Sequence, residues 1–361
     1  MIEEFPLPAS IYAADEYQPG GLRTARGRRY VDLCSGTGGI GGGIHPKLRT
    51  AIWDAVSSVP WNVYAYPNVW RERAESRLLR HFPLYDFAFF SGGAEAVEAA
   101  LRVAHAVTGD ARTLAYEGGF HGKSMGALSL HWRDASHFVH PYNVTGMEYP
   151  EVGAVFVEPT QTRNGVHIAS EEFKVEINEA YETRGDTLVV VDEISTSFRT
   201  GHFRNWPGNP EIILLGKNFG QGIPVSILCV REDLVPMVKK RVSLTSGYGG
   251  NPIASVAITE TIEYVRRHSV LDTIQQNGKR FGAILESATS EFDDIQIYQN
   301  GMWLGVQFTD PLIAAHHQSR LLDMGWLTSL ADSQIRLSPP FDLPQDTMVD
   351  FSSDLNHVTR V

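Results

Sequence analysis

The residues whose types could do chemistry fall in one order along the chain. A glycine pair that ends at Gly93 precedes a helical pattern beginning at Ala94, and Phe120 follows a short apolar stretch. Asp192 ends the apolar run LVVVD, and Lys217 ends the run ILLGK 25 residues later. Each alone is also typical of ordinary structure: a turn, a core aromatic, a helix cap and a surface lysine. Their combination at the ends of apolar runs indicates a single ligand site.

These residue types together suit a phosphorylated pyridine. Free amides at a helix start, opened here by Gly93 and Ala94, bind a phosphate, and the ring of Phe120 can stack on a flat heterocycle. A buried Asp192 beside a pyridine nitrogen keeps it protonated, so that the ring accepts electrons. The amine of Lys217 can form a Schiff base and then move protons. We therefore predict pyridoxal 5'-phosphate as the cofactor, with Lys217 and Asp192 as catalytic residues.

Two glycine motifs point to other phosphate sites. Residues 36–41 read GTGGIG and fit a dinucleotide fingerprint, but Pro46 opposes the helix that such a site needs, and the nearest acidic residue, Asp54, comes too early. Residues 118–124, with VVVDE further on, resemble a P-loop and its magnesium-binding strand. Glu117 stands where that loop requires glycine, and its charge would repel phosphates. An NTPase is kept as a distant alternative.

The composition restricts the class of protein and its partners. The chain has 361 residues and a net charge of -11, without a long Lys/Arg run, which argues against nucleic-acid binding. Its two cysteines, Cys34 and Cys229, give no disulfide framework. The start lacks the pattern of a signal peptide, and no apolar stretch is long enough to span a bilayer. We expect a cytoplasmic protein that acts on small molecules.

Three nearby histidines could suggest a metal. His131, His137 and His140 lack a cysteine or carboxylate pattern that would complete a zinc site. We interpret this segment as a solvated loop and predict no metal.

Alternating strand and helix patterns predict an α/β fold that would position these residues. Helical spacing covers 94–107 and 171–184, with Ser170 as a candidate cap for the second helix. Short apolar runs are typical of strands buried in a parallel sheet; they cover 87–90, 154–157, 188–191, 212–215 and 225–230.

The regular alternation of strand and helix patterns ends at Asn251-Pro252, where Pro252 suits the first turn of a helix. Residues 268–290 again look helical, and 301–308 and 334–337 look like strands. We predict a large α/β domain over 46–260 with a mostly parallel sheet. A small α+β domain would combine 261–361 with the N-terminal residues 1–45.

At this point the chain resembles the class III aminotransferases, the fold type I group that includes ornithine and 4-aminobutyrate aminotransferases. The segments that carry the resemblance occur in the family's order over nearly the whole chain: GRRYVDLCSGTGGIGGGIHP, SGGAEAVEAALRVA, YEGGFHGKSMGALS, VFVEPTQTRNGV, VVVDEISTSFRTG, GKNFGQGIPVS, GYGGNPIASVA and IRLSPPF.

The resemblance implies roles for individual residues. Gly93 and Ala94 bind the phosphate, the Phe120-His121 pair lies at the ring, Asp192 pairs with the ring nitrogen and Lys217 carries the Schiff base. Glu158 and Gln161 lie at the edge of the site, and Arg336 holds a substrate carboxylate. It also implies a homodimer with shared sites, in which the GYGGNP loop reaches the neighbour's phosphate.

Several positions depart from the family pattern and put the substrate in doubt. Gly247 replaces the usual threonine, so that Ser246 is the candidate for the missing phosphate contact. Ser195 replaces a glutamine near the cofactor, and Arg163 replaces a glutamate, which reverses a charge. The predicted function is amino transfer between an amino-acid-like donor and a keto acid or aldehyde. Racemisation, aminomutation or decarboxylation on the same cofactor stays open, as does a non-catalytic homologue, although Lys217 and Asp192 argue against it.

Overall fold

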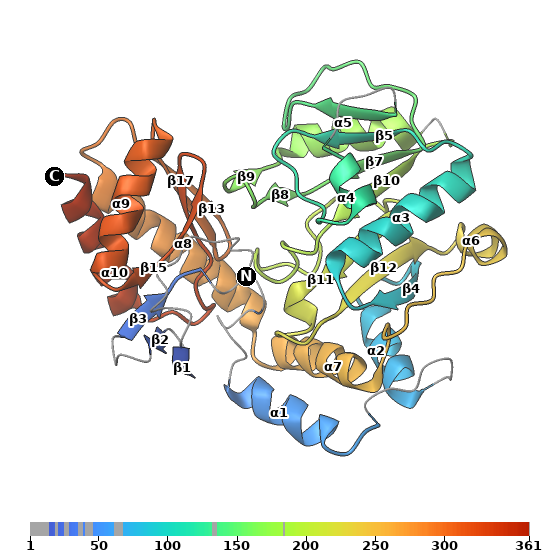
Figure 1. The fold of residues 1–361 in the computed structure, drawn as a ribbon, viewed down its shortest axis with the longest axis horizontal. Coiled ribbons are helices and arrows are strands. Elements are labelled where there is room, and N and C mark those ends of the chain that lie inside the picture. Colours follow the sequence, from blue (N-terminus) through green and yellow to red (C-terminus); the bar gives the residue numbers. More distant parts are fainter. Residues whose placement is uncertain are drawn as a thin grey trace.

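The computed structural model describes residues 14–18, 21–24, 29–34, 39, 46–60, 68–131, 136–182 and 185–360. The glycine-rich segment 36–41 lies outside these residues except for Gly39. Two lobes are visible, one built on a large sheet and one containing the C-terminal elements (Figure 1). Within the described residues, no helix combines the length and hydropathy needed to cross a bilayer.

The large sheet has seven strands in the described part of the chain, in the order β4-β12-β11-β10-β7-β5-β6. Neighbouring strands are parallel from β11 to β6, whereas β12 runs antiparallel to both of its neighbours. The sheet is therefore mostly parallel, as predicted. Its strands are β4 (Tyr85–Phe90), β5 (Thr113–Tyr116), β6 (His137–His140), β7 (Ala154–Val157), β10 (Leu188–Asp192), β11 (Ile212–Gly216) and β12 (Ser226–Arg231).

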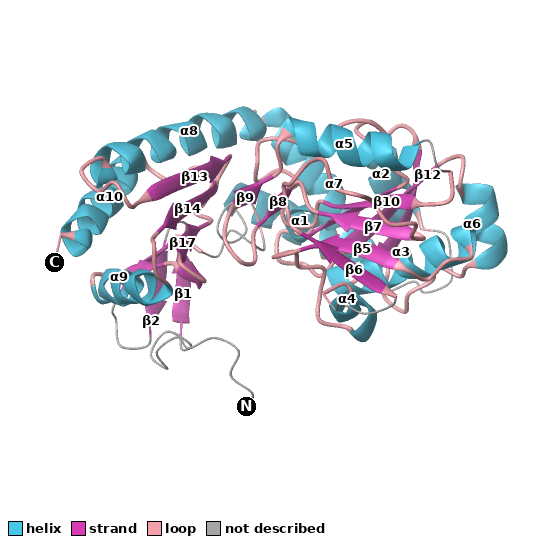
Figure 2. Cartoon of the chain, turned by 90° about the horizontal axis from the view of Figure 1, so that it is seen from above, coloured by secondary structure: helices cyan, strands magenta, loops and turns pink. Residues whose placement is uncertain are grey.

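Helices cover both faces of this sheet, with α3 and α4 on one side and α5 on the other (Figure 2). Alternation along β10 explains the two layers, because Leu188 and Val190 pack on the α3 side and Val189 and Val191 on the α5 side. The helices of this lobe are α1 (Pro46–Val56), α2 (Val69–Leu78), α3 (Gly93–Thr108), α4 (Met125–Ser129), α5 (Glu171–Glu182), η2 (Lys217–Phe219), α6 (Val235–Arg241) and α7 (Pro252–Arg267).

Local sequence explains where these helices begin. Ser170 Oγ accepts a hydrogen bond from Phe173 N at 3.1 Å, which confirms the predicted cap of α5. Asn251 Oδ1 accepts from Ala254 N at 2.9 Å, and Pro252 occupies the first position of α7, also as predicted. α3 ends at Thr108 and is capped by Gly109, whose φ of 77° suits glycine in a left-handed cap.

The second lobe contains an antiparallel sheet of order β13-β14-β17-β16, covered by helices. Strand β3 pairs in parallel with β15, so residues 29–32 lie beside the C-terminal elements. The remaining elements are β1 (Ala14–Gln18), β2 (Gly21–Thr24), β3 (Arg29–Asp32), β8 (Thr160–Gln161), β9 (His167–Ile168), α8 (Val270–Thr289), β13 (Gln296–Asn300), β14 (Trp303–Gln307), α9 (Pro311–Asp323), β15 (Trp326–Leu327), β16 (Ser329–Ala331), β17 (Gln334–Leu337) and α10 (Gln345–Thr359).

Two expectations from the sequence were wrong. His137 and His140 are the first and last residues of strand β6 and do not lie in a solvated loop. β6 pairs with β5. Strand β12 is antiparallel because only residues 217–225 connect it to β11, too few for the crossover that parallel strands need.

Candidate active site

The carboxyl ends of the parallel strands bring the predicted residues to one edge of the sheet. β10 ends at Asp192, and Lys217 follows β11 directly. Glu158 follows β7, and the loop after β5 contains Phe120 and His121. Ligands of parallel α/β sheets bind at this edge.

These loops enclose a cavity of about 350 Å³. Lys217 and Asp192 line it together with Gly93, Ala94, Phe120, His121 and Ser195, so seven of the residues singled out in the sequence meet there. The rest of its described lining is Ser91, Gly92, Gly122, Ile194, Gly222, Ile223, Pro224 and Val225.

Lys217 enters this cavity from a strained backbone position. Its φ is 39°, a left-handed conformation that is uncommon for a residue with a side chain. Its Nζ donates a hydrogen bond to Ser195 Oγ. Burial lowers the pKa of the Lys217 amine, an effect that Arg336 reinforces and that the negative charges of Asp192 and Glu158 oppose.

Asp192 is held by a buried histidine. His121 Nδ1 donates to Asp192 Oδ2 at 2.9 Å, and Ile194 N donates to the other carboxylate oxygen at 3.1 Å. Burial alone would lower the pKa of His121, but the hydrogen bond and charge of Asp192, with the charge of Glu158, raise it above its ordinary value. The pair therefore keeps a carboxylate oriented within an enclosed site.

Glu158 adds a second buried carboxyl to this cluster. Its Oε2 accepts a hydrogen bond from Phe120 N at 2.8 Å, which fixes the loop that carries the aromatic ring. Burial raises the pKa of Glu158 to about 7, with His121 lowering it and Asp192 raising it further. Gln161 likewise supports this loop, because its Nε2 donates to Glu117 O at 2.8 Å.

The start of α3 forms the third side of the cavity. Ser226 Oγ donates to Gly92 O at 2.7 Å and so anchors the turn before the helix to β12. A Cβ added at Gly92 would have nothing within 4 Å, whereas one at Gly93 would lie 3.0 Å from Ile194 Cδ1. The first amides of α3 thus border open space that suits an anion.

The described residues fit pyridoxal phosphate at three points. Lys217 supplies an amine for the aldehyde, Asp192 supplies a carboxylate for the ring nitrogen, and the start of α3 supplies amides for the phosphate. Among the described residues, no group of three or more His, Cys, Asp or Glu side chains could hold a metal ion.

Two arginines lie near this site. Arg336 Nε donates to Ser329 Oγ at 3.1 Å, and its Nη1 donates to Thr162 O. A residue of β16 and the residue after β8 therefore hold the guanidinium. Burial, and then the charge of Arg163, lower the pKa of Arg336 to about 10. The exposed Arg163 places its Cζ 5.4 Å from the centre of the Phe120 ring.

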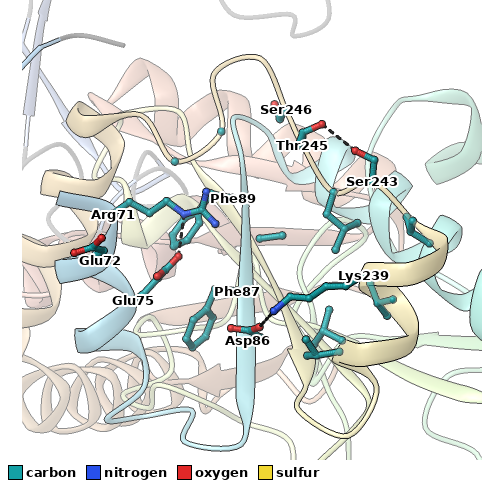
Figure 3. A pocket seen from close by; sticks show the side chains of 18 of the residues that line it. Arg71, Glu72, Glu75, Asp86, Phe87, Phe89, Lys239, Ser243, Thr245 and Ser246 are labelled. Atoms are coloured by element: carbon teal, nitrogen blue, oxygen red, sulfur yellow. Dashed lines mark hydrogen bonds and ion pairs between the residues drawn. The ribbon is translucent and has the colours of Figure 1, made fainter. Parts of the chain in front are cut away.

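Ser246 and Gly247 are not among the described residues that line the Lys217 cavity. Ser246 lines a separate cavity of about 710 Å³ between α2, β4 and α6 (Figure 3). Arg71 stacks over Phe89 in that cavity, with 5.3 Å between Cζ and the ring centre. Contact of this loop with a cofactor phosphate would therefore have to occur in another copy of the chain, and it stays a prediction.

Sequence reasoning missed Trp303, which is 1% exposed and donates from Nε1 to Ser195 O at 3.0 Å. An aromatic residue inside an apolar strand is typical of a core, so the sequence alone offers no sign that Trp303 adjoins the site. It also missed the wall formed by Ile223, Pro224 and Val225, although these follow Lys217 in the segment GKNFGQGIPVS.

Comparison with known proteins agrees with this geometry. The sequence profile of the family described as Aminotransferase class-III matches residues 11–150 and 142–358. A Pyrococcus horikoshii relative, which carries the provisional name of a LysW-aminoadipate semialdehyde/glutamate semialdehyde transaminase, is 30% identical over 90% of both chains. The acetylornithine aminotransferase of Methanopyrus kandleri is 30% identical over 79% of this chain and 77% of its own.

Solved structures share the fold at lower sequence identity. Ornithine aminotransferase from Toxoplasma gondii superposes with a TM-score of 0.83 at 22% identity, covering 96% of this chain and 92% of that one. A Bacillus anthracis aminotransferase gives a TM-score of 0.86 at 18% identity, with coverage of 97% and 93%. The chain belongs to the class III aminotransferases, enzymes that transfer amino groups with pyridoxal phosphate as cofactor.

Proposed function

We propose that Lys217 holds pyridoxal phosphate covalently and that the chain moves an amino group between an amino-acid-like donor and a keto acid or aldehyde. The observation that carries this proposal is the meeting of Lys217, Asp192 and the start of α3 around one cavity. When bound, the cofactor ring accepts the electrons released as a proton leaves the carbon next to the substrate amine.

Lys217 then acts as the proton carrier. Because burial lowers the pKa of its amine, a larger share of the amine is neutral near neutral pH and can accept a proton. The hydroxyl of Ser195 receives a hydrogen bond from the same Nζ and so orients it. In this role Ser195 contacts the lysine, where the family's longer glutamine would reach the cofactor.

Asp192 and the start of α3 hold the two ends of the cofactor. Asp192 would keep the ring nitrogen protonated, while His121 fixes the carboxylate by its 2.9 Å hydrogen bond. Gly93 and Ala94 would offer amides to the phosphate. Ser246 and Gly247 would complete the phosphate site of a second copy, which makes the active form a homodimer.

Arg336 is the proposed binder of a substrate carboxylate. Its guanidinium is held by Ser329 and Thr162, and a planar fork suits a carboxylate. Arg163, over the Phe120 ring, adds a second positive charge where the family has a negative one. We therefore propose that one substrate of the pair is a dicarboxylate such as glutamate or 2-oxoglutarate. The acetylornithine and LysW-semialdehyde transaminases among the relatives suggest an amino acid or semialdehyde as the other.

The cofactor and the reaction can be tested on the purified protein. We expect visible absorption from the bound cofactor, and borohydride reduction followed by peptide mapping should label Lys217. Mixtures of ornithine or acetylornithine with 2-oxoglutarate should exchange their amino group, and Lys217→Ala should abolish this exchange. Label on Lys123 instead, or racemisation or decarboxylation without exchange, would refute the proposal.

Substrate recognition is tested by the two arginines. Charge-assisted contacts contribute about 1.5–3 kcal/mol each, so Arg336→Ala and Arg163→Ala should raise the KM for acidic substrates by roughly 10- to 150-fold. The KM for substrates that lack a carboxylate should change little. If neither variant distinguishes the two substrate classes, carboxylate recognition lies elsewhere.

A further inference from the structure

Trp303 lies between the predicted carboxylate site and the predicted catalytic lysine. The side chain belongs to β14 and is 1% exposed. Two guanidinium groups lie over its ring, with Cζ of Arg336 at 5.6 Å and Cζ of Arg199 at 5.8 Å from the ring centre. A buried tryptophan attracts such cations because its ring face is electron-rich and water is excluded.

Arg199 is held in place beside the Trp303 ring by backbone hydrogen bonds. This arginine is completely buried, and its Nη2 donates to Met302 O and Pro339 O, both at 2.8 Å. These carbonyls belong to the residues that border Trp303 and the end of β17. Burial lowers the pKa of Arg199 to about 9, so the guanidinium stays charged at neutral pH and retains its attraction for the ring.

The register of two strands brings Arg336 to the same ring. Gly305 of β14 is paired directly with Arg336 of β17. Trp303 is two residues before Gly305 and therefore faces the same side of the sheet. Trp303 and Arg336 are thus diagonal neighbours, a separation that large side chains bridge.

The other edge of the indole reaches the lysine. Trp303 Nε1 donates to Ser195 O at 3.0 Å, and the hydroxyl of the same serine accepts from Lys217 Nζ. One rigid side chain therefore contacts both the guanidinium of Arg336 and the residue that orients Lys217.

We propose that Trp303 is a positioning residue that holds the guanidinium of Arg336 in register with Lys217, and thereby determines how strongly carboxylates bind. The proposal rests on the proposed carboxylate role of Arg336. It requires the electron-rich ring face for the contact with Arg336 and the indole N–H for the contact with Ser195.

The test uses the holoenzyme and glutarate, a dicarboxylate without an amino or keto group, with binding measured by calorimetry. Trp303→Met removes the ring, and we expect the Kd of glutarate to rise roughly tenfold. Trp303→Phe keeps a ring face for Arg336 and loses only the N–H contact with Ser195, so the rise in the glutarate Kd should stay under about threefold. Trp326→Phe is the matched control, because Trp326 is also buried but donates to Asp354 Oδ2 at 2.8 Å; its glutarate affinity should be unchanged.

A second series avoids any loss of folding. Replacing Trp303 by tryptophans with one, two and three fluorines keeps the shape and the N–H while weakening the electron-rich ring face. The logarithm of the glutarate Kd should rise stepwise with fluorine number at position 303 and stay flat in the same series at position 326. In turnover assays, fluorination of Trp303 should raise the KM for a carboxylate donor more than it lowers kcat.

The outcomes separate this inference from the proposed function. If Arg336→Ala weakens glutarate while the fluorinated series at 303 has no effect, the positioning role of Trp303 is wrong and the proposed function stands. If Arg336→Ala also leaves glutarate binding unchanged, both are wrong. A stepwise loss at 303 together with a loss in Arg336→Ala supports the inference.

Discussion

Asp192 and Lys217 bring an acidic and a basic side chain into one cavity, and each contacts a neighbour that orients it. His121 holds Asp192, and Ser195 holds Lys217. Both neighbours act through a single hydrogen bond, so small changes at either position should act on chemistry before they act on stability. The sequence could nominate Lys217 and Asp192 for one site because the predicted chemistry restricts the residue type, and the structure brings both to one cavity. It could not nominate Trp303, since any large apolar side chain is typical of that strand position.

Replacing Asp192 by asparagine should reduce kcat by at least about 100-fold while changing cofactor affinity much less. The amide keeps the size of the side chain and can still contact His121, but it cannot hold a ring nitrogen protonated. Steady-state kinetics and a cofactor titration measure the two effects separately. Asp86→Asn serves as the control, because that exposed carboxylate pairs with Lys239 at 3.1 Å. A near wild-type kcat for Asp192→Asn would contradict its assigned role.

Glu158 should make the stability of the cofactor-free protein depend on pH. Its pKa rises from 4.5 to about 7 on burial, so between these values the folded state binds more protons than the unfolded state. Stability from this group therefore falls as pH rises through that window. Glu158→Gln keeps an acceptor for Phe120 N and removes the titration. Its stability relative to wild type should increase from pH 5 to pH 8 by on the order of 2 kcal/mol.

Denaturant unfolding at several pH values tests this expectation. A constant difference between Glu158→Gln and wild type across the range would show that Glu158 does not titrate there.

The strands that the sequence predicted best are buried and consist almost entirely of apolar residues. β7, β10 and β11 are buried apolar runs, and their predicted ranges differ from the observed ones by at most one residue. β6 was missed because its sequence HFVH is only half-buried at the sheet edge and contains two polar residues. The direction of β12 depends on connection length, which periodicity does not reveal.

The turn before α4 should be sensitive to a single methyl group. Gly122 has a φ of 130°, and an added Cβ would lie 2.8 Å from the Cβ of Ala94 in the first turn of α3. Gly122→Ala should therefore displace the first turn of α3, where we propose that the cofactor phosphate binds, and raise the cofactor Kd by roughly tenfold or more. Absorbance titration of the cofactor-free protein measures this.

Gly146→Ala is the matched control for this substitution. Gly146 also has a positive φ, of 73°, but its added Cβ would have nothing within 4 Å. It should cost backbone strain and leave cofactor affinity unchanged. Equal loss of affinity in both variants would show that strain alone, rather than contact with α3, is responsible.

The complete molecule should be a dimer at working concentration. Ser246 lines a cavity away from Lys217 within one chain, and Tyr248 in the same loop is 68% exposed. Both observations suit a loop that completes a site in a second copy. Light scattering across a dilution series should show that activity falls as the dimer dissociates, and a fully active monomer would contradict this expectation.

The strand order of the large sheet also affects how the chain folds. β4 is the first strand of this sheet in the sequence, and it pairs with β12, the last. During synthesis β4 therefore leaves the ribosome long before its partner, with Phe87 and Phe89 exposed until the sheet closes. Because Ser226 of β12 also anchors the turn before α3, the side of the cavity formed by the start of α3 is completed only at that late step. Pairing between such distant segments folds slowly, so cofactor binding should be among the last properties that a refolding chain regains.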